Sequence, residues 1–328
     1  MNQSDYTIKR VSLDPGAARR LSNTTKSSPM MESITPRWFL KFLPWVPVEA
    51  GIYRVNCIKK ASEDDGPFNE YGEKHIESNY RPINEDLVSE TFADYEEHPR
   101  EYMLNLVQTI LRMNTNVTDI FNHPIDQKNE QLRLTVEAMK ERQEWELIND
   151  SEFGLISSVA PHMKVRSRSG APCPDDLDEL LSRVWKKPAF FLAHPRAIAA
   201  FGRECTRRGV PPVTAHLFGS PFMTWRGVPL VPCDKMLVGN RARSHMGGGK
   251  TSILLMRVGE KDQGVIGLHQ PGIPDESDFP SLSVKLCGVD NRGIAAYILS
   301  LYFSVAVLTN DALGMLEDVE VGSYYDNE

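Results

Sequence analysis

Helical periodicity is clearest over residues 124–150, where apolar residues recur every three or four positions. The spacing predicts one long helix, and a similar spacing over residues 101–113 predicts a further helix. The long helix has two apolar stripes. One consists of Leu132, Val136 and Met139, and the other of Leu134, Ala138, Trp145 and Ile148. On its polar side, residues one turn apart predict two solvent-exposed ion pairs, Lys140 with Glu144 and Arg142 with Glu146.

From about residue 170 the pattern alternates between helices and strands. Residues 175–187 begin with acidic residues, as helices often do, and Gly209 suits the end of a helix over residues 195–209. Short apolar runs predict strands over residues 189–194, 221–232, 251–258, 264–269 and 282–288.

Residues 294–308 form an apolar run of about fifteen residues that follows a turn at 290–293. As a helix the run is too short to cross a hydrocarbon core of about 30 Å. Because it is rich in β-branched and aromatic residues, it predicts a long strand, and we expect no membrane-spanning segment.

The first hundred residues divide by charge. Residues 1–41 contain seven basic and three acidic residues, which predicts an arm that lies on another surface. After an aromatic cluster at 38–45 and an expected strand over 52–58, residues 61–101 contain thirteen acidic and three basic residues. Such a long acidic segment predicts a projecting loop that contacts a neighbour.

Composition excludes several classes of protein. The chain has 328 residues, and its formal net charge of −7 argues against a dedicated nucleic-acid binder. Its five cysteines include no CxxC pair, so neither a disulfide framework nor a zinc ribbon is expected. The first residues lack the apolar stretch of a signal peptide, so we expect a cytoplasmic location.

The best candidate for chemistry is residues 244–251, which nearly match the phosphate-binding pattern GxxxxGK[ST]. Gly249, Lys250 and Thr251 are in register, but Ser244 replaces the first glycine. A phosphate-binding loop needs a helix N-terminus after it, and the following residues have the composition of a strand. GxSxG, HExxH and GxGxxG are absent. We therefore expect no catalytic residues, no metal site and no cofactor, with a nucleotide-binding enzyme as an alternative.

The arm, the projecting loop and the long helix extend from a mixed α/β body and lack a core of their own, so we expect neighbouring subunits of a closed assembly to bury them. Several blocks resemble the shell proteins of family 2A encapsulins, relatives of tailed-phage major capsid proteins. The resemblance extends from about residue 17 to 321. Its main blocks are ITPRWFLKFLPWVPVEAGIYRVN (34–56), QLRLTVEAMKERQEWELIN (131–149), PDDLDELLSRVWKKPAFFLAHPRAIAAFGRE (174–204), LFGSPFMTWRGVPLVPCDK (217–235), DQGVIGLHQPG (262–272) and SLYFSVAVLTNDALGMLEDV (300–319).

The resemblance implies an α+β, Hong Kong 97-type capsid fold. Its parts would be an N-terminal arm over 1–48, an extended loop (E-loop) over 49–99 and a P-domain with the spine helix over 100–150. An apical A-domain would occupy 151–280, and return strands of these domains with the C-terminus would occupy 281–328. From this chain order we expect His216, Phe218 and Gly219 to lie near a pore on the fivefold axis.

The implied function is structural and not enzymatic. Copies, about sixty in the simplest lattice, would assemble into an icosahedral compartment in the bacterial cytoplasm. The compartment would enclose a cysteine desulfurase cargo and its sulfur product, and pyridoxal phosphate would belong to the cargo alone. The shell would bind neither nucleic acid nor membrane. A prophage capsid protein is the alternative within the fold, although DNA packaging favours a cationic interior.

Overall fold

The computed structural model describes residues 16, 19–20, 32–49, 51–59, 73–75, 94–114, 127–240, 249–271 and 281–322. The chain forms two compact units, of which the smaller is Ala50–Met103. In that unit β2 (Ile52–Val55) pairs antiparallel with β3 (Arg100–Met103). An ion pair of 2.8 Å between Arg54 Nε and Glu101 Oε1 joins the two strands. Most of the acidic segment predicted to project lies outside the described residues.

The larger unit contains two sheets, and the first is built around β14 (Ile294–Val307). One edge of β14 pairs with β4 (Asn105–Asn114), and the other pairs with β13 (Leu282–Val289) and β12 (Val265–His269). β1 (Trp45–Pro47) joins β12 in parallel. The predicted long strand is confirmed. None of the helices in the described ranges is long and apolar enough to cross a membrane.

The helix predicted over residues 101–113 is wrong, because this segment forms β3 and β4. Val107, Thr109 and Leu111 are half-buried, whereas Leu106, Gln108 and Ile110, which alternate with them, are exposed. This alternation has the period of a strand. The segment pairs with β14 over ten consecutive positions, and that ladder overrides a sequence spacing that also fits a helix.

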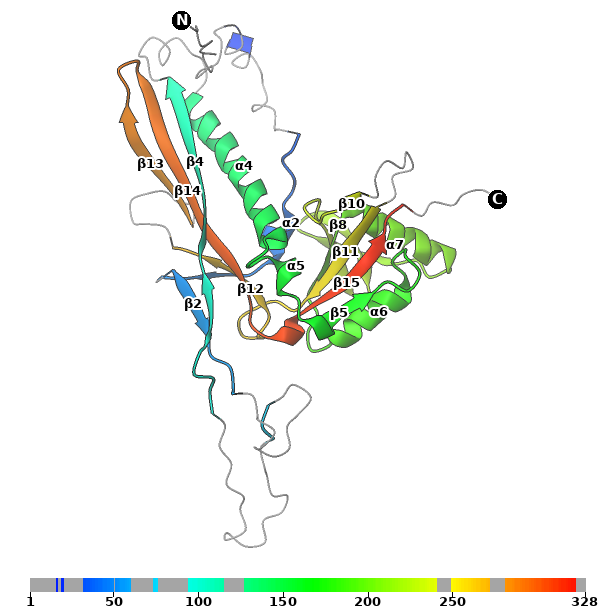
Figure 1. Ribbon diagram of the computed structural model, residues 1–328. Coiled ribbons are helices and arrows are strands. Elements are labelled where there is room, and N and C mark those ends of the chain that lie inside the picture. The colour runs from blue at the N-terminus through cyan, green and yellow to red at the C-terminus, as the bar shows by residue number, and fades with distance from the viewer. Residues whose placement is uncertain are drawn as a thin grey trace, which may run out of the picture. The chain divides into compact units, whose positions relative to one another are not determined.

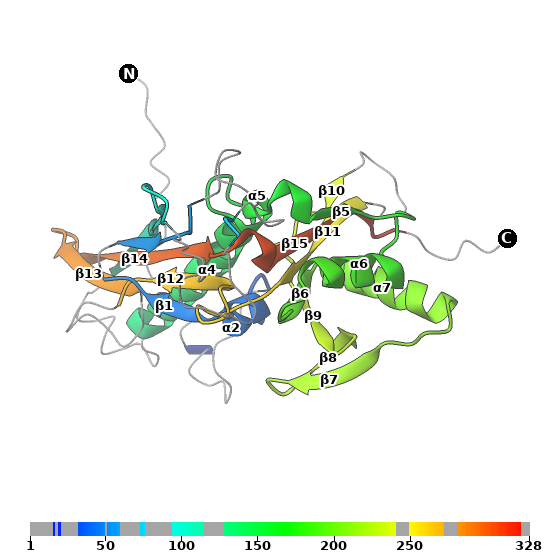
Figure 2. The same ribbon diagram turned by 90° about the horizontal axis from the view of Figure 1, so that it is seen from below.

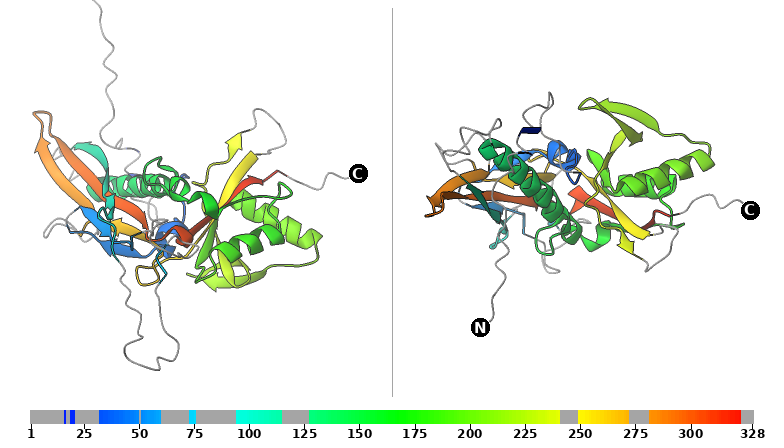
Figure 3. Two further views of the ribbon diagram at one scale, coloured as in Figure 1. Left: turned by 60° about the horizontal axis from the view of Figure 1, so that its bottom comes forward. Right: turned by 90° about the horizontal axis from the view of Figure 1, so that it is seen from above.

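The spine helix α4 (Gln127–Asn149) confirms the helix predicted over residues 124–150. Its 23 residues extend for roughly 35 Å, and it packs along β4 and β14 (Figures 1 and 3). The predicted ion pair between Arg142 and Glu146 is present. The predicted exposed pair between Lys140 and Glu144 is wrong, because Glu144 is only 1% exposed. It is buried beside the segment that follows β9.

The second sheet has the strand order β5-β15-β11-β6-β9-β8-β7, with β10 beside β11. Its apolar centre, including Phe191, Leu192 and Leu254, is fully buried, as expected for strands covered on both faces. The strands are β5 (Lys164–Arg166), β6 (Phe190–Ala193), β7 (Val213–Leu217), β8 (Ser220–Trp225), β9 (Val228–Pro232), β10 (Gly239–Asn240), β11 (Gly249–Met256) and β15 (Leu313–Glu320).

Helices α6 (Pro174–Arg183) and α7 (Pro195–Arg207) pack against this sheet (Figure 2). Both begin with a proline, which suits a first helical turn. Gly209 has a φ of 72°, so the predicted glycine end of α7 is confirmed. The shorter helices are α2 (Trp38–Phe42), α5 (Leu155–Ser158), η3 (Pro161–Met163) and η4 (Asn310–Ala312).

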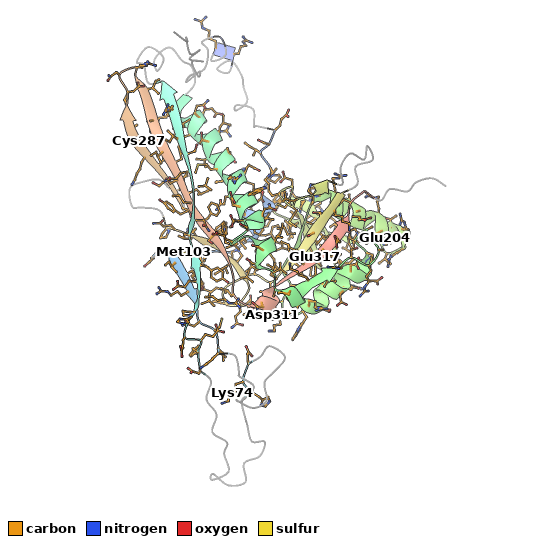
Figure 4. All side chains as sticks on the ribbon, viewed as in Figure 1. Lys74, Met103, Glu204, Cys287, Asp311 and Glu317 are labelled. Atoms are coloured by element: carbon orange, nitrogen blue, oxygen red, sulfur yellow. The ribbon has the colours of Figure 1, made fainter. Side chains whose placement is uncertain are left out.

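A buried ion pair lies where β14 passes into β15 and the chain moves from one sheet to the other. Arg257, 2% exposed, donates from Nη2 to Asp311 Oδ1 at 2.9 Å and to Thr309 Oγ1 at 2.8 Å. Asp311 lies in the turn between the two strands (Figure 4). Although burial would raise the pKa of Asp311, hydrogen bonds from Arg257 and Lys186 hold it well below its usual value. The pair therefore fixes this connection.

Candidate assembly and binding surfaces

The glycine-rich segment does not form a phosphate-binding loop in the part that is described. Residues 241–248 lie outside the described ranges, and β11 begins at Gly249. Lys250 lies in this strand, with its Nζ 3.2 Å from Asp318 Oδ1. A strand therefore stands where phosphate binding needs the N-terminus of a helix.

One group within the described ranges has metal-ligating side chains close together. Ligand atoms of Glu144, Cys233 and Asp234 lie within 4.8 Å of one another. Asp234 is already paired, because Lys235 Nζ lies 2.8 Å from Asp234 Oδ2 and also 2.8 Å from Glu141 Oε2. Burial also raises the pKa of the Cys233 thiol, which keeps it protonated and a poor metal ligand. We interpret this group as part of an ion-pair network that also contains Lys235 and Glu141.

The same ion-pair network connects the N-terminal arm to α4. The Thr35 backbone N–H donates to Glu141 Oε1 at 2.8 Å, and Arg37 Nη1 donates to the same oxygen at 3.0 Å. Arg37 also pairs with Glu137. Burial would raise the pKa of Glu141, but hydrogen bonds from Lys235 and Thr35 lower it below its ordinary value. Glu141 thus stays ionised and connects the arm, α4 and the segment after β9.

The three residues predicted to line a pore lie on one hairpin. His216 is near the end of β7, and Phe218 and Gly219 form the turn into β8. Their φ angles of 49° and 74° are those of a tight hairpin turn. Phe218 is 62% exposed, yet its ring centroid lies 5.0 Å from that of Phe42 on α2. The hairpin is therefore held against the N-terminal arm, and the pore assignment stays a prediction.

Apolar side chains on one side of the strand β4 are exposed in the isolated chain. Leu106 and Ile110 on β4 are 44% and 57% exposed. Leu111 and Tyr297 belong to the opposite face, where Lys128 of α4 lies over the Tyr297 ring at 5.5 Å. Helix α4 covers that other side, whereas Leu106 and Ile110 remain exposed among the residues that the structure describes. Exposed apolar residues gathered on one face often mark an interaction surface.

Comparisons with known proteins agree on one family. A family profile described as "Type 2A encapsulin shell protein SrpI-like" matches residues 61–323. The chain is 54% identical over 309 residues to the type 2A encapsulin shell protein SrpI of Synechococcus elongatus, covering 94% of each chain. It is 48% identical over 310 residues to the type 2A encapsulin shell protein of Mycobacterium leprae, covering 94% of this chain and 95% of that one.

Solved structures give the same result for the fold. A chain in the cryo-EM structure of the holo-SrpI encapsulin complex from Synechococcus elongatus matches with a TM-score of 0.78 at 51% identity. The match covers 97% of this chain and 99% of that one. A capsid chain of the empty GTA particle matches with a TM-score of 0.58 at 12% identity, covering 93% and 99%. The second match concerns the fold alone.

Proposed function

Because the chain belongs to the type 2A encapsulin shell protein family, we propose that its copies close into an icosahedral compartment. The simplest lattice would hold about sixty copies. The expected family and the α+β, Hong Kong 97-type fold are both confirmed. The observation that carries the proposal is the match, at 51% identity over 97% of the chain, to a subunit of a solved encapsulin complex.

Features of the isolated chain support an assembled state. Ala50–Met103 forms a unit of its own, and among its described residues β2 and β3 make a two-stranded ladder. A two-stranded ladder is marginally stable alone, so contacts with neighbouring subunits would stabilise it. The apolar residues Leu106 and Ile110 would likewise be buried by a neighbour.

We propose that the compartment encloses a cysteine desulfurase and retains its sulfur product in the bacterial cytoplasm. The support is the resemblance to family 2A shells, together with the negative charge of the chain, which does not suit nucleic-acid packaging. The shell protein would have no enzymatic activity and no cofactor of its own. Pyridoxal phosphate would be bound by the cargo, and neither nucleic acid nor membrane would be a partner.

We place the pore at the hairpin turn that contains Phe218 and Gly219, with His216 beside it. The hairpin presents the exposed His216 and Phe218 side chains, while contacts to Trp38 and Phe42 hold its position. A subunit arrangement in which these residues lie away from every symmetry axis would remove this part of the proposal.

The native mass of the protein expressed alone tests the shell proposal. Size-exclusion chromatography with light scattering should give a particle of roughly 2.2 MDa, about sixty times the 37.0 kDa chain. Negative-stain images should show uniform hollow particles without nucleic acid. A stable monomer or small oligomer would contradict the proposal. Particles filled with DNA would favour the alternative of a prophage capsid protein. Binding of ATP that is lost in the Lys250→Ala variant would favour the alternative of a nucleotide-binding enzyme.

Co-expression with a cysteine desulfurase from the same genome tests the cargo. The absorbance of pyridoxal phosphate should then co-elute with the particle and should be absent from shells made alone. Particles that form normally but exclude this enzyme, and that retain a different one, would overturn the cargo assignment while leaving the shell intact.

A further inference from the structure

We propose that the N-terminal arm holds the β7–β8 hairpin in place through the aromatic ring of Phe218, so that displacement of the arm releases the hairpin turn. Both α2 of the arm and the hairpin belong to the larger unit of a single chain. The proposal goes beyond the shell function, and it depends neither on the pore nor on the identity of the cargo. It makes the arm a strap for a part of the same subunit that is distant in sequence.

Phe218 has a backbone conformation that phenylalanine rarely adopts. Its φ is 49°, and that of the following Gly219 is 74°. The two residues form the turn between the paired residues Leu217 and Ser220, and such a turn needs positive φ angles. Asparagine followed by glycine is the usual choice there, because a bulky side chain in the left-handed region crowds the backbone. Phenylalanine at this position therefore needs a compensating contact.

The arm provides this contact. The ring centroid of Phe218 lies 5.0 Å from that of Phe42 at an interplanar angle of 78°, and 6.4 Å from that of Trp38 at 28°. Edge-to-face and offset-stacked pairs at such distances are favourable. Both arm residues belong to α2, and Phe42 also packs on the buried Phe190 of β6, with 5.2 Å between ring centroids. The turn is thus held by a helix that is itself anchored in the core.

A second aromatic residue extends the contact along the hairpin. Phe222 of β8 is 3% exposed, and its ring centroid lies 5.2 Å from that of Trp38 and 5.6 Å from that of Phe42. The other strand of the hairpin, β7, is the last strand of the second sheet, and within the described ranges it pairs with β8 (Figure 2). Cover from α2 therefore reaches the turn and β8, and β7 depends on β8 for its pairing.

Two opposing effects limit the stability of the contact between the arm and the hairpin turn. Phe218 remains 62% exposed, so its ring buries only part of its apolar surface against the arm. The unfavourable backbone conformation opposes that gain. Displacement of α2 would remove the gain and leave the unfavourable conformation, so the turn would open. Because coupling between two parts of a molecule is reciprocal, loss of the Phe218 ring would also loosen α2.

Hydrogen exchange followed by mass spectrometry on the full chain tests the coupling from the side of the arm. In Trp38→Ala, amides of residues 213–224 should exchange at least about five-fold faster than in the native protein, because aromatic pairs are lost. Trp185→Ala is the matched control, since Trp185 is 66% exposed, and it should leave the hairpin unchanged. Unchanged α6 amides in both variants separate local release from global unfolding. Native exchange rates of the hairpin in folded Trp38→Ala would overturn the proposal.

The reverse experiment changes the hairpin and leaves the arm sequence intact, so it also decides the matter if Trp38→Ala does not fold. Asparagine suits this turn, so Phe218→Asn should keep the hairpin folded. Amides of arm residues 35–43 should nevertheless exchange at least about five-fold faster, because α2 loses the ring. Thr214→Asn, an exposed change on β7, should leave the arm unchanged. An arm that exchanges equally slowly in Phe218→Asn and the native chain would show that the two parts are not coupled. Light scattering on the same samples reports particle formation, so failure of the shell is distinguished from failure of the coupling.

Discussion

At the scale of single residues, Glu144 is the most unusual group in the described chain. It is 1% exposed, so its carboxyl group is almost completely removed from solvent. Burial raises its pKa to about 7, and the negative charges of Glu141 and Asp234 act in the same direction. Lys235 and Arg37 oppose the shift, and the Cys233 thiol also faces the carboxyl. Near neutral pH this carboxyl is therefore partly protonated.

This pKa predicts a pH dependence of stability. A carboxyl whose pKa is raised on folding stabilises the folded state fully below its unfolded value, near 4.5. That stability is lost as the pH rises through about 7. A shift of this size corresponds to roughly 3 kcal/mol. Glu144→Gln should therefore raise stability at pH 5 by about 1 kcal/mol or less and at pH 8 by roughly 3 kcal/mol.

Denaturant unfolding at pH 5 and pH 8 measures the effect. Glu146→Gln is the matched control, because Glu146 lies on the same helix and pairs with Arg142. The control should keep the pH dependence of the native protein. If Glu144→Gln keeps it as well, the carboxyl of Glu144 does not titrate in this range and its environment differs from the one described.

Glu144 also illustrates what a sequence pattern can predict for a single side chain. Helical spacing correctly placed it one turn from Lys140, but spacing contains no information on which segment covers that side of the helix. The cover comes from Cys233 and Asp234, about ninety positions later. The burial of Gln143 on the same helix could not be predicted for the same reason.

At the scale of elements, secondary structure was predicted correctly where the spacing of apolar residues and the packing of the segment in the fold favour the same element. The helix α4 and the strand β14 are long and regular, and both were predicted. The prediction for residues 101–113 was wrong because their apolar positions fit the period of a helix as well as that of a strand. Pairing with β14 decides in favour of the strand. Strand composition after Gly249 correctly argued against a phosphate-binding loop, since β11 occupies that place.

The arm element β1 depends on a glycine in its partner strand. Gly267 of β12 is paired with Trp45, and a Cβ at this position would lie 2.7 Å from the indole ring. It would also lie 2.9 Å from a methyl group of Leu43. The indole is rigid, and its Nε1 is held by the carbonyl of Leu40 at 3.0 Å. The ring cannot move without disturbing the arm.

We expect Gly267→Ala to loosen the arm and to destabilise the protein by about 1–3 kcal/mol, as overpacking in a core usually does. Limited proteolysis should then cleave faster within residues 32–49, and the melting temperature should fall. Gly202→Ala in α7 is the control, because its new Cβ would meet only the flexible end of Met223 at 3.1 Å. Equal protease resistance in Gly267→Ala and the native chain would show that the arm tolerates the displacement.

At the scale of the whole molecule, the family and fold followed from blocks of sequence rather than from any catalytic motif. The assembly of a shell protein does not depend on a reaction centre whose residue types and spacing could be recognised. Its function lies in surfaces, and a surface becomes visible only when the alternation of a strand and the position of its neighbours are both known. The uncovered side of β4 is such a surface, and it emerged only after the segment was recognised as a strand.

A substitution on the exposed side of β4 tests assembly without disturbing the fold of the subunit. Ile110 is 57% exposed in the isolated chain, so Ile110→Lys should not change the folding of a subunit. If a neighbour covers this face, each copy would bury an unpaired ammonium, which costs several kcal/mol at every equivalent contact. We expect small oligomers in light scattering, with an unchanged circular dichroism spectrum. Arg112→Lys, on the same exposed side of β4, keeps its charge and should still form particles. Normal particles from Ile110→Lys would mean that this face stays open in the shell, and the subunit contacts would then have to come from other surfaces.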